Sequence, residues 1–153
     1  MRGKFFSNLV VLLSVFAFAG CAKVIVKSDS DPNVNLGEFK TFYVQNFAPD
    51  KRELEKIIAE KLNAFGFNAT SGVSPTPPGP VDVLVTYRDR WMWDITNYML
   101  EITIEFHDPE SNFTFASGRS YRTSLARKDP EVMIEEVLQD LFKRKADKSI
   151  QKQ

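Results

Sequence analysis

The segment 98–106 shows the strictest alternation of apolar and polar residues in this 153-residue chain. Successive side chains of a β-strand point to opposite faces. Alternation of this kind therefore predicts a strand in a sheet that is covered on one side only. The apolar side would carry Tyr98, Leu100, Ile102, Ile104 and Phe106, and the other side Glu101, Thr103, Glu105 and His107. We expect helices over the apolar side, and solvent or a partner over the polar side.

Two segments have the periodicity of amphipathic helices. The first is predicted to begin at Asp50 as N-cap, with Glu53 completing a capping box, and to end at Gly66. Its apolar face would be Leu54, Ile57, Ile58, Leu62 and Phe65. The second is predicted to begin with Asp129 as cap and Pro130 at the first position. Its apolar stripe would be Met133, Ile134, Val137, Leu138, Leu141 and Phe142, and the polar tail 143–153 is expected to fray.

The remaining segments read as strands and turns. Strands are expected at 23–27, 41–47, from residue 67, and at 81–91, 98–106 and 113–124, where Gly118 would mark a bulge. The Pro/Gly-rich segment 71–80 is predicted to be a surface connector, with a proline-motif docking site as the alternative. The sum is an α+β fold. We expect a two-layer sandwich in which one mixed, mostly antiparallel sheet of about five or six strands carries two helices on one face.

The N-terminal segment has the layout of a secretory signal. Arg2 and Lys4 precede an apolar core at 9–18, and small residues follow it. The sequence Phe18-Ala19-Gly20-Cys21 resembles a lipobox, where signal peptidase II cuts and the new N-terminal cysteine receives lipid. It departs from the usual pattern by carrying Phe18 in place of leucine. The alternative is an uncleaved membrane helix, because the uncharged run 5–22 reaches the lower edge of spanning length.

Cleavage before Cys21 would divide the chain into a removed signal peptide at 1–20, a lipidated N-terminus at 21–22, a single domain at 23–143 and the polar tail 144–153. Cys21 is the only cysteine, so no disulfide can form within the chain. Loss of Arg2 and Lys4 leaves 20 − 2 = 18 basic against 20 acidic residues. This balance argues against nucleic acid as a partner.

Lipidation of Cys21 would anchor the protein to a lipid bilayer through two or three acyl chains, including palmitate. The resemblance to Gram-negative lipoproteins also bears on location. Aspartate directly after the cysteine is the usual signal for retention in the inner membrane, and here that residue is Ala22. The resemblance therefore implies the cell envelope, at the periplasmic face of the outer membrane.

The segments Ser30-Asp31-Pro32 and Phe39-Lys40-Thr41-Phe42 resemble the start of a family of uncharacterised bacterial lipoproteins. In that family a D-x-D-P turn precedes a strand of the F-x-K-T-aromatic type, followed by helix, strands and helix. The resemblance covers residues 24–143, apart from the Pro-rich insertion at 71–80. It implies the fold and the location, but no catalytic residue, because the family has no assigned activity.

Chemistry-bearing residues are few. Alternate strand positions lie about 7 Å apart, so Glu105 and His107 could share a divalent metal ion, with Glu101 on the same face. A solvated strand face is the commoner explanation of such residues, and without a second histidine or a cysteine the metal site would be weak. The sequence contains no G-x-S-x-G motif, no free Cys–His pair and no Gly-rich phosphate loop. We therefore predict no metal, no cofactor and no enzymatic activity.

Aromatic and arginine side chains gather around one predicted hairpin. This composition suits a protein interface, a glycan platform or contact with a lipid interface. The candidate partner surface comprises Tyr87, Arg88, Arg90, Trp91, Trp93 and Tyr98. As the alternative, Trp91 and Trp93 continue the inward parity of the strand and cap the core. We expect a membrane-anchored envelope lipoprotein with a non-catalytic binding or structural role, or else a small-ligand binder with a pocket between helices and sheet.

Overall fold

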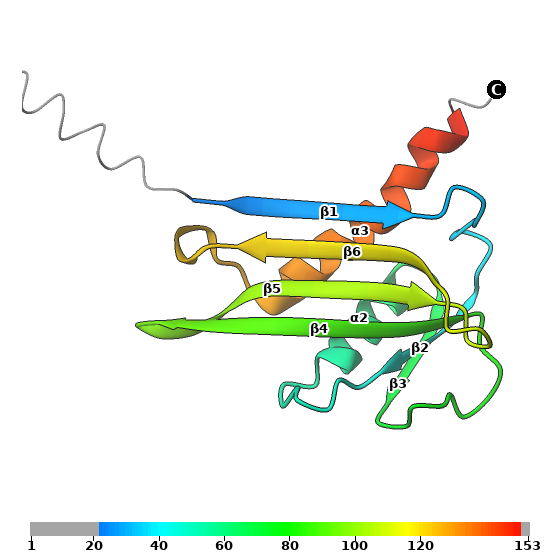
Figure 1. Cartoon of the computed structure of the whole chain (residues 1–153), viewed down its shortest axis with the longest axis horizontal. Helices are drawn as coiled ribbons and strands as arrows, with labels where there is room; N and C mark the ends of the chain where they lie inside the picture. Colours follow the sequence, from blue (N-terminus) through cyan, green and yellow to red (C-terminus); the bar gives the residue numbers. More distant parts are fainter. Residues whose placement is uncertain (1–21, 151–153) are drawn as a thin grey trace, which may run out of the picture.

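The computed structural model describes residues 22–150, with side chains to residue 143. One mixed six-stranded sheet carries two helices on the same face, as the sequence predicts (Figure 1). The strands are β1 (Val24–Ser30), β2 (Thr41–Gln45), β3 (Asn68–Gly72), β4 (Val83–Asp94), β5 (Thr96–His107) and β6 (Thr114–Arg122). The helices are α2 (Leu54–Ala64) and α3 (Pro130–Ile150), and a 3₁₀ turn, η1, spans Ser124–Ala126.

The sheet has the order β1-β6-β5-β4-β2-β3. Strand β2 runs parallel to both β3 and β4, and α2 connects β2 to β3, so the predicted βαβ unit is confirmed. Strands β4, β5, β6 and β1 pair antiparallel in succession. Helix α2 packs on the parallel half, and α3 crosses β1, β6 and β5.

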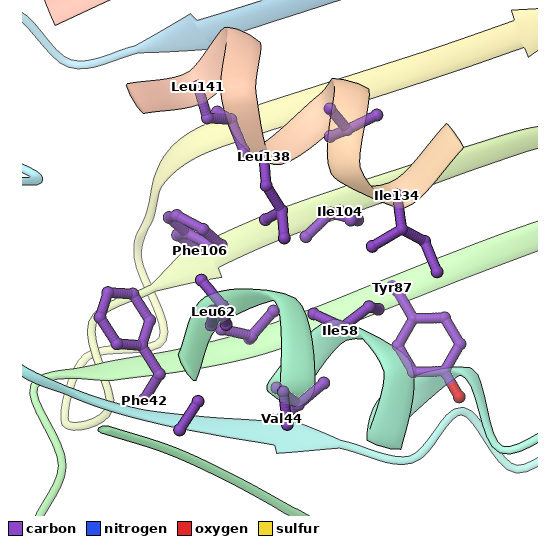
Figure 2. Close-up of a cluster of buried hydrophobic side chains, with 14 of the residues drawn as sticks. Phe42, Val44, Ile58, Leu62, Tyr87, Ile104, Phe106, Ile134, Leu138 and Leu141 are labelled. Carbon is purple, nitrogen blue, oxygen red and sulfur yellow. The ribbon is translucent and has the colours of Figure 1, made fainter. Parts of the chain in front are cut away.

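The core fills the space between the helices and the sheet (Figure 2). From the sheet come Val44, Ile104 and Phe106, and from the helices Ile58, Leu62, Ile134 and Leu138, none of them exposed. Phe42 lies between Phe67 and Phe106, with ring centroids 4.9 and 5.7 Å away. Burying side chains of this size contributes roughly 1.5–3 kcal/mol each. The apolar faces predicted for both helices are therefore the faces that hold the layers together.

Helix α2 begins differently from the prediction. Its first residue is Leu54, and Glu53 stands before it with a left-handed backbone (φ 56°) and no side-chain cap. Asp50 serves the helix from farther away, because its Oδ2 accepts the amide of Leu54 at 2.8 Å. The predicted capping box is therefore wrong, because Asp50 does not occupy the N-cap position. Its carboxylate nevertheless accepts a hydrogen bond from a free amide at the start of the helix. Gly66, with φ 91°, ends the helix as predicted.

Gly118 marks no bulge, contrary to the prediction. It lies where α3 crosses β6, and a Cβ there would stand 2.6 Å from Cγ1 of Val137 and 3.1 Å from Cγ of Leu141. The strand therefore carries glycine because the helix lies directly against its backbone. At the start of α3, the carbonyl of Asp129 accepts the amides of Val132 and Met133, which confirms that predicted boundary.

A register shift between Arg90 and Trp91 alters the alternation of β5. Arg90 pairs with Glu101 and Trp91 pairs with Met99, so Leu100 is the extra residue. Beyond this bulge Met99 enters the core, which leaves Leu100 buried but outside the main cluster. The predicted inward position of Tyr98 is therefore wrong, and its neighbour Met99 takes that place.

The C-terminal segment predicted as a fraying tail continues α3 as far as Ile150. Within residues 22–150, no helix has both the length and the apolar composition needed to cross a membrane. The signal segment and Cys21 lie outside the described residues.

Candidate partner surface

The structure divides the six predicted surface residues among three environments. Tyr87 points into the core and is only 2% exposed, so its assignment to a surface is wrong. Arg88 and Arg90 are exposed on the sheet face opposite the helices. Trp91, Trp93 and Tyr98 lie on the part of the β4–β5 hairpin nearest its turn. One continuous patch of all six therefore does not form.

The outer face of the sheet presents an ion cluster that spans three strands. The carboxylate of Glu101 in β5 forms ion pairs with two arginines. Its Oε2 lies 2.9 Å from Nη2 of Arg90 in β4 and 2.7 Å from Nη2 of Arg119 in β6. Arg119 also lies over the ring of Tyr121, 5.6 Å from its centroid. Because Arg90 and Arg119 are half exposed, this cluster adds little to stability. It does give the face fixed charges of both signs, which suits recognition of a complementary surface.

The outer face is uncovered over only part of its width. At the β2–β3 side, the loop after β3 folds across it, and the hydroxyl of Tyr43 donates to the carbonyl of Ser74 at 2.9 Å. This contact leaves Tyr43 2% exposed, although it faces away from the helices. The Pro-rich loop therefore connects β3 to β4 and also shields one edge of the sheet. The open part of the face lies over β4, β5, β6 and β1.

Trp91 closes the core at the hairpin end. Its indole nitrogen donates to Oδ2 of Asp89, and the guanidinium of Arg52 lies 3.8 Å from its ring centroid. Beside it a surface hollow of about 680 Å³ opens between the hairpin and the start of α3. Trp93 continues the same strand face but extends past the helices, and 72% of it is exposed. The prediction that these tryptophans face inward and cap the core is therefore confirmed for Trp91 and wrong for Trp93.

A buried polar network, which sequence reasoning missed, surrounds Tyr87. Its hydroxyl lies 2.8 Å from Oδ2 of Asp50 and 3.3 Å from Oε2 of Glu55, and both carboxylates are buried. Asn46 donates to the same oxygen of Glu55 at 2.9 Å. Burial, with the hydrogen bond to Asp50, raises the pKa of Tyr87. The phenol therefore stays protonated and fastens the β2–α2 connection to β4. The signal available in the sequence was a tyrosine at an inward position, which needs a polar partner when buried.

His107 is buried rather than solvated. Its Nε2 lies 2.8 Å from the hydroxyl of Thr86, and its Nδ1 lies 2.9 Å from that of Thr114. Nε2 is 3.9 Å from the carboxylate of Glu105. Among the described side chains, no group of three or more His, Cys, Asp or Glu residues is arranged to hold a metal ion.

No protein-family model matches the chain, and no curated protein sequence does. Among solved structures, the chain is similar to PelC from Paraburkholderia phytofirmans, described as a dodecamer in two crystal forms. The TM-score is 0.57 for both, at 19% and 18% identity, and the match covers 78% of this chain and 97% of PelC. A PDZ domain protein from Parabacteroides distasonis matches with a TM-score of only 0.44. At this identity the likeness to PelC shows a shared fold.

Proposed function

We propose that the protein is a lipoprotein anchored in the cell envelope, with a non-catalytic accessory role in which the open outer face of its sheet holds a protein partner. The observation that carries the proposal is the ion cluster of Arg90, Glu101 and Arg119, held across three strands on the sheet face opposite α2 and α3. Charges held in a defined geometry on a broad, rigid face select partners by electrostatic complementarity.

The filled core favours a protein partner over a small ligand. The side chains that would line a pocket between helices and sheet, such as Ile58, Ile104 and Leu138, pack on one another and are fully buried. Ligand sites need a concave, largely preformed cavity. The Trp91 hollow and a smaller one over Arg88 and Glu105 both lie at the surface. A small-ligand role remains the second candidate, and the Trp91 hollow is the place for it.

The anchor is part of the same proposal, and the support for it is the sequence around Cys21. A metabolic label tests it directly. Cells that express the full chain and are fed an alkyne analogue of palmitate should incorporate label into the wild type, whereas Cys21→Ser should stay unlabelled and unprocessed. Equal labelling of the two proteins would contradict the anchor.

Photo-crosslinking in intact cells tests the partner face. A photoreactive amino acid in place of Arg88 stands on the open face, and the same residue in place of Val73, 83% exposed in the loop after β3, serves as the matched control. We expect a discrete protein adduct from position 88 and none from position 73. Adducts of equal yield from both positions would contradict the assignment of the face. Because PelC is described as a dodecamer, mass spectrometry should distinguish another protein from a second copy of this chain.

A further inference from the structure

We propose that the β4–β5 hairpin tip and the η1 turn dock on a lipid bilayer, with Trp93, Ile95 and Leu125 at the boundary between headgroups and acyl chains. This inference rests on the proposed anchor at Cys21. It goes beyond that anchor because it gives the folded domain a fixed orientation on the membrane.

At this end of the domain, these three side chains are more exposed than the neighbouring apolar side chains of Met92 and Val24, each of which is 47% exposed. Trp93 is 72% exposed, Ile95 86% and Leu125 72%. Single exposed apolar residues are ordinary on a protein surface, but a cluster marks an interaction site. Arg127 holds the two segments together, because its Nη1 donates to Thr96 beside the hairpin turn and its Nε donates to the carbonyl of Ser124 in η1, both at 2.8 Å.

The residue at the hairpin turn is unfavourable for folding. Asp94 pairs with Thr96, so Ile95 alone forms the turn, with φ 62°. A β-branched residue in this region is a genuine outlier, whereas glycine or asparagine accepts it readily. Strained residues that persist in a fold tend to cluster at functional sites. A large apolar side chain at the most protruding turn, at a position suited to glycine, fits insertion into an apolar phase.

Strand register places the proposed anchor beside this tip. Val24 of β1 pairs with Arg122 of β6, and the neighbouring Tyr121 pairs with Glu101 of β5, so the start of β1 is level with position 100. Ile95 lies 100 − 95 = 5 residues beyond that level, about 17 Å at 3.3 Å per residue. Figure 1 shows the start of β1 and the hairpin tip at the same end of the molecule.

The tether to the anchor is short. Only Ala22 and Lys23 separate Cys21 from β1 in the sequence, and three residue steps of chain span at most roughly 11 Å. Lys23 is already fixed, because its amide donates to the hydroxyl of Thr123 at 3.0 Å and its carbonyl accepts the amide of Thr123. A bilayer that holds Cys21 is therefore within reach of a hairpin that extends about 17 Å toward it.

The chemistry of this end favours lipid over a charged protein surface. Arg127 is paired with Asp94 at 3.5 Å and Lys128 with Glu136 at 2.7 Å, so neither guanidinium nor ammonium is left unpaired. The hairpin tip also presents apolar area with one tryptophan, the residue type enriched where membranes meet water. We expect the contact to depend little on anionic lipid or on salt, unlike binding through a basic patch.

Quenching of tryptophan fluorescence by brominated lipid tests the proposal, because the chain has only Trp91 and Trp93. The full chain is purified from bacterial membranes and reconstituted in phosphatidylethanolamine–phosphatidylglycerol vesicles whose acyl chains carry bromine near the headgroup. The Trp91→Phe variant, which retains Trp93, should lose at least half of its emission relative to vesicles without bromine. The Trp93→Phe variant, which retains the half-buried Trp91, should lose under a tenth.

The Ile95→Ser/Leu125→Ser double variant in the Trp91→Phe background should quench less than half as much as its parent. Equal, weak quenching of both single-tryptophan variants would overturn the docking, as would a specific protein crosslink from position 95 in intact cells. Palmitate-analogue labelling of the same preparations separates the two proposals. Labelled protein with unquenched Trp93 refutes the docking alone, and unlabelled protein with quenched Trp93 refutes the anchor alone.

Discussion

His107 shows how a residue can lie on the expected face and still have an unexpected environment. Alternation along β5 places it opposite the core, as the sequence predicts, yet it is only 7% exposed. The hydroxyls of Thr86 and Thr114 bracket its ring, one at each nitrogen. In a neutral imidazole one nitrogen donates and the other accepts, and a threonine hydroxyl can serve either. The ring therefore joins β4, β5 and β6 at one edge of the polar face.

Replacing this histidine should destabilise the domain. His107→Ala removes both hydrogen bonds and leaves the two threonine hydroxyls to find water, so we expect the free energy of unfolding to fall by about 1–3 kcal/mol. Glu105→Ala, on the same face but more than a third exposed, should change it by less than about 0.5 kcal/mol. Chemical denaturation of the two variants makes the comparison. A fully solvated His107 would give two equal, small effects.

For the candidate surface residues of β4, the sequence correctly predicts which face of the sheet each side chain points to. It does not predict how far along the strand the helices cover that face. Tyr87 and Trp91 face the helices because they continue the positions of Val83 and Val85. Trp93 has the same parity, but no helix reaches over it. Burial depends on where α2 and α3 end relative to a strand. That relation is tertiary, so a local pattern does not contain it.

At the level of elements, the contact between α3 and β6 depends on the absence of a side chain. Gly118 pairs with Ser28 of β1 on one side and Ile104 of β5 on the other, so it is in the interior of the sheet. A glycine there is unfavourable for a strand. Val137 and Leu141 occupy the space its Cβ would fill, and the gain is the close packing of the helix.

Gly118→Ala should therefore destabilise the protein, although alanine has the better intrinsic strand preference. Overpacking against two buried helix residues costs about 1–3 kcal/mol. The matched control is Gly79→Ala, where an added Cβ meets nothing within 4 Å. A second change, Val137→Ala, should recover part of the loss in the Gly118→Ala background. Thermal unfolding of the variants tests this, and equal melting temperatures for both alanine substitutions would contradict it.

The periodicity of apolar residues in the sequence predicts the helices and strands themselves. It does not predict where each element ends or the register in which the strands pair. The apolar stripes of both helices identify them, as does the alternation at Ile102 and Ile104. The bulge at Leu100 leaves no signal, because Met99 and Leu100 are both apolar and either can face inward. The start of α2 is shifted for a related reason. Asp50 has a capping side chain, but three residues of loop separate it from Leu54, the first residue of the helix.

At the scale of the whole molecule, carboxylates fasten both halves of the sheet. Asp82 joins the parallel half, because its Oδ2 accepts hydrogen bonds from the amide of Lys40, just before β2, at 2.8 Å and from the amide of Thr41, the first residue of β2, at 2.9 Å. These backbone hydrogen bonds lower the pKa of Asp82. Glu136 joins α3 to the antiparallel half through the buried Arg122, at 2.6 Å. Partial burial alone would raise the pKa of Glu136, but hydrogen bonds from Lys128 and Arg122 outweigh it and lower that pKa.

The two lowered pKa values predict a loss of stability in acid. A carboxylate whose pKa is lower in the folded state contributes stability that is fully present above its unfolded value, near 3.8 for Asp82 and 4.5 for Glu136. That contribution is lost as the pH falls through the folded values. The free energy of unfolding should therefore be level above about pH 5 and fall steadily below about pH 4.5.

Glu136→Gln should flatten this fall and also lower stability at pH 7 by about 1–3 kcal/mol, because Arg122 then lies buried without a charged partner. Glu110→Gln, exposed in the β5–β6 turn, should leave the pH profile unchanged. Urea unfolding at a series of pH values measures both quantities. If Glu136→Gln kept the full acid dependence, ionisation at the junction of α3 and β6 would not be what stabilises this half of the sheet at neutral pH.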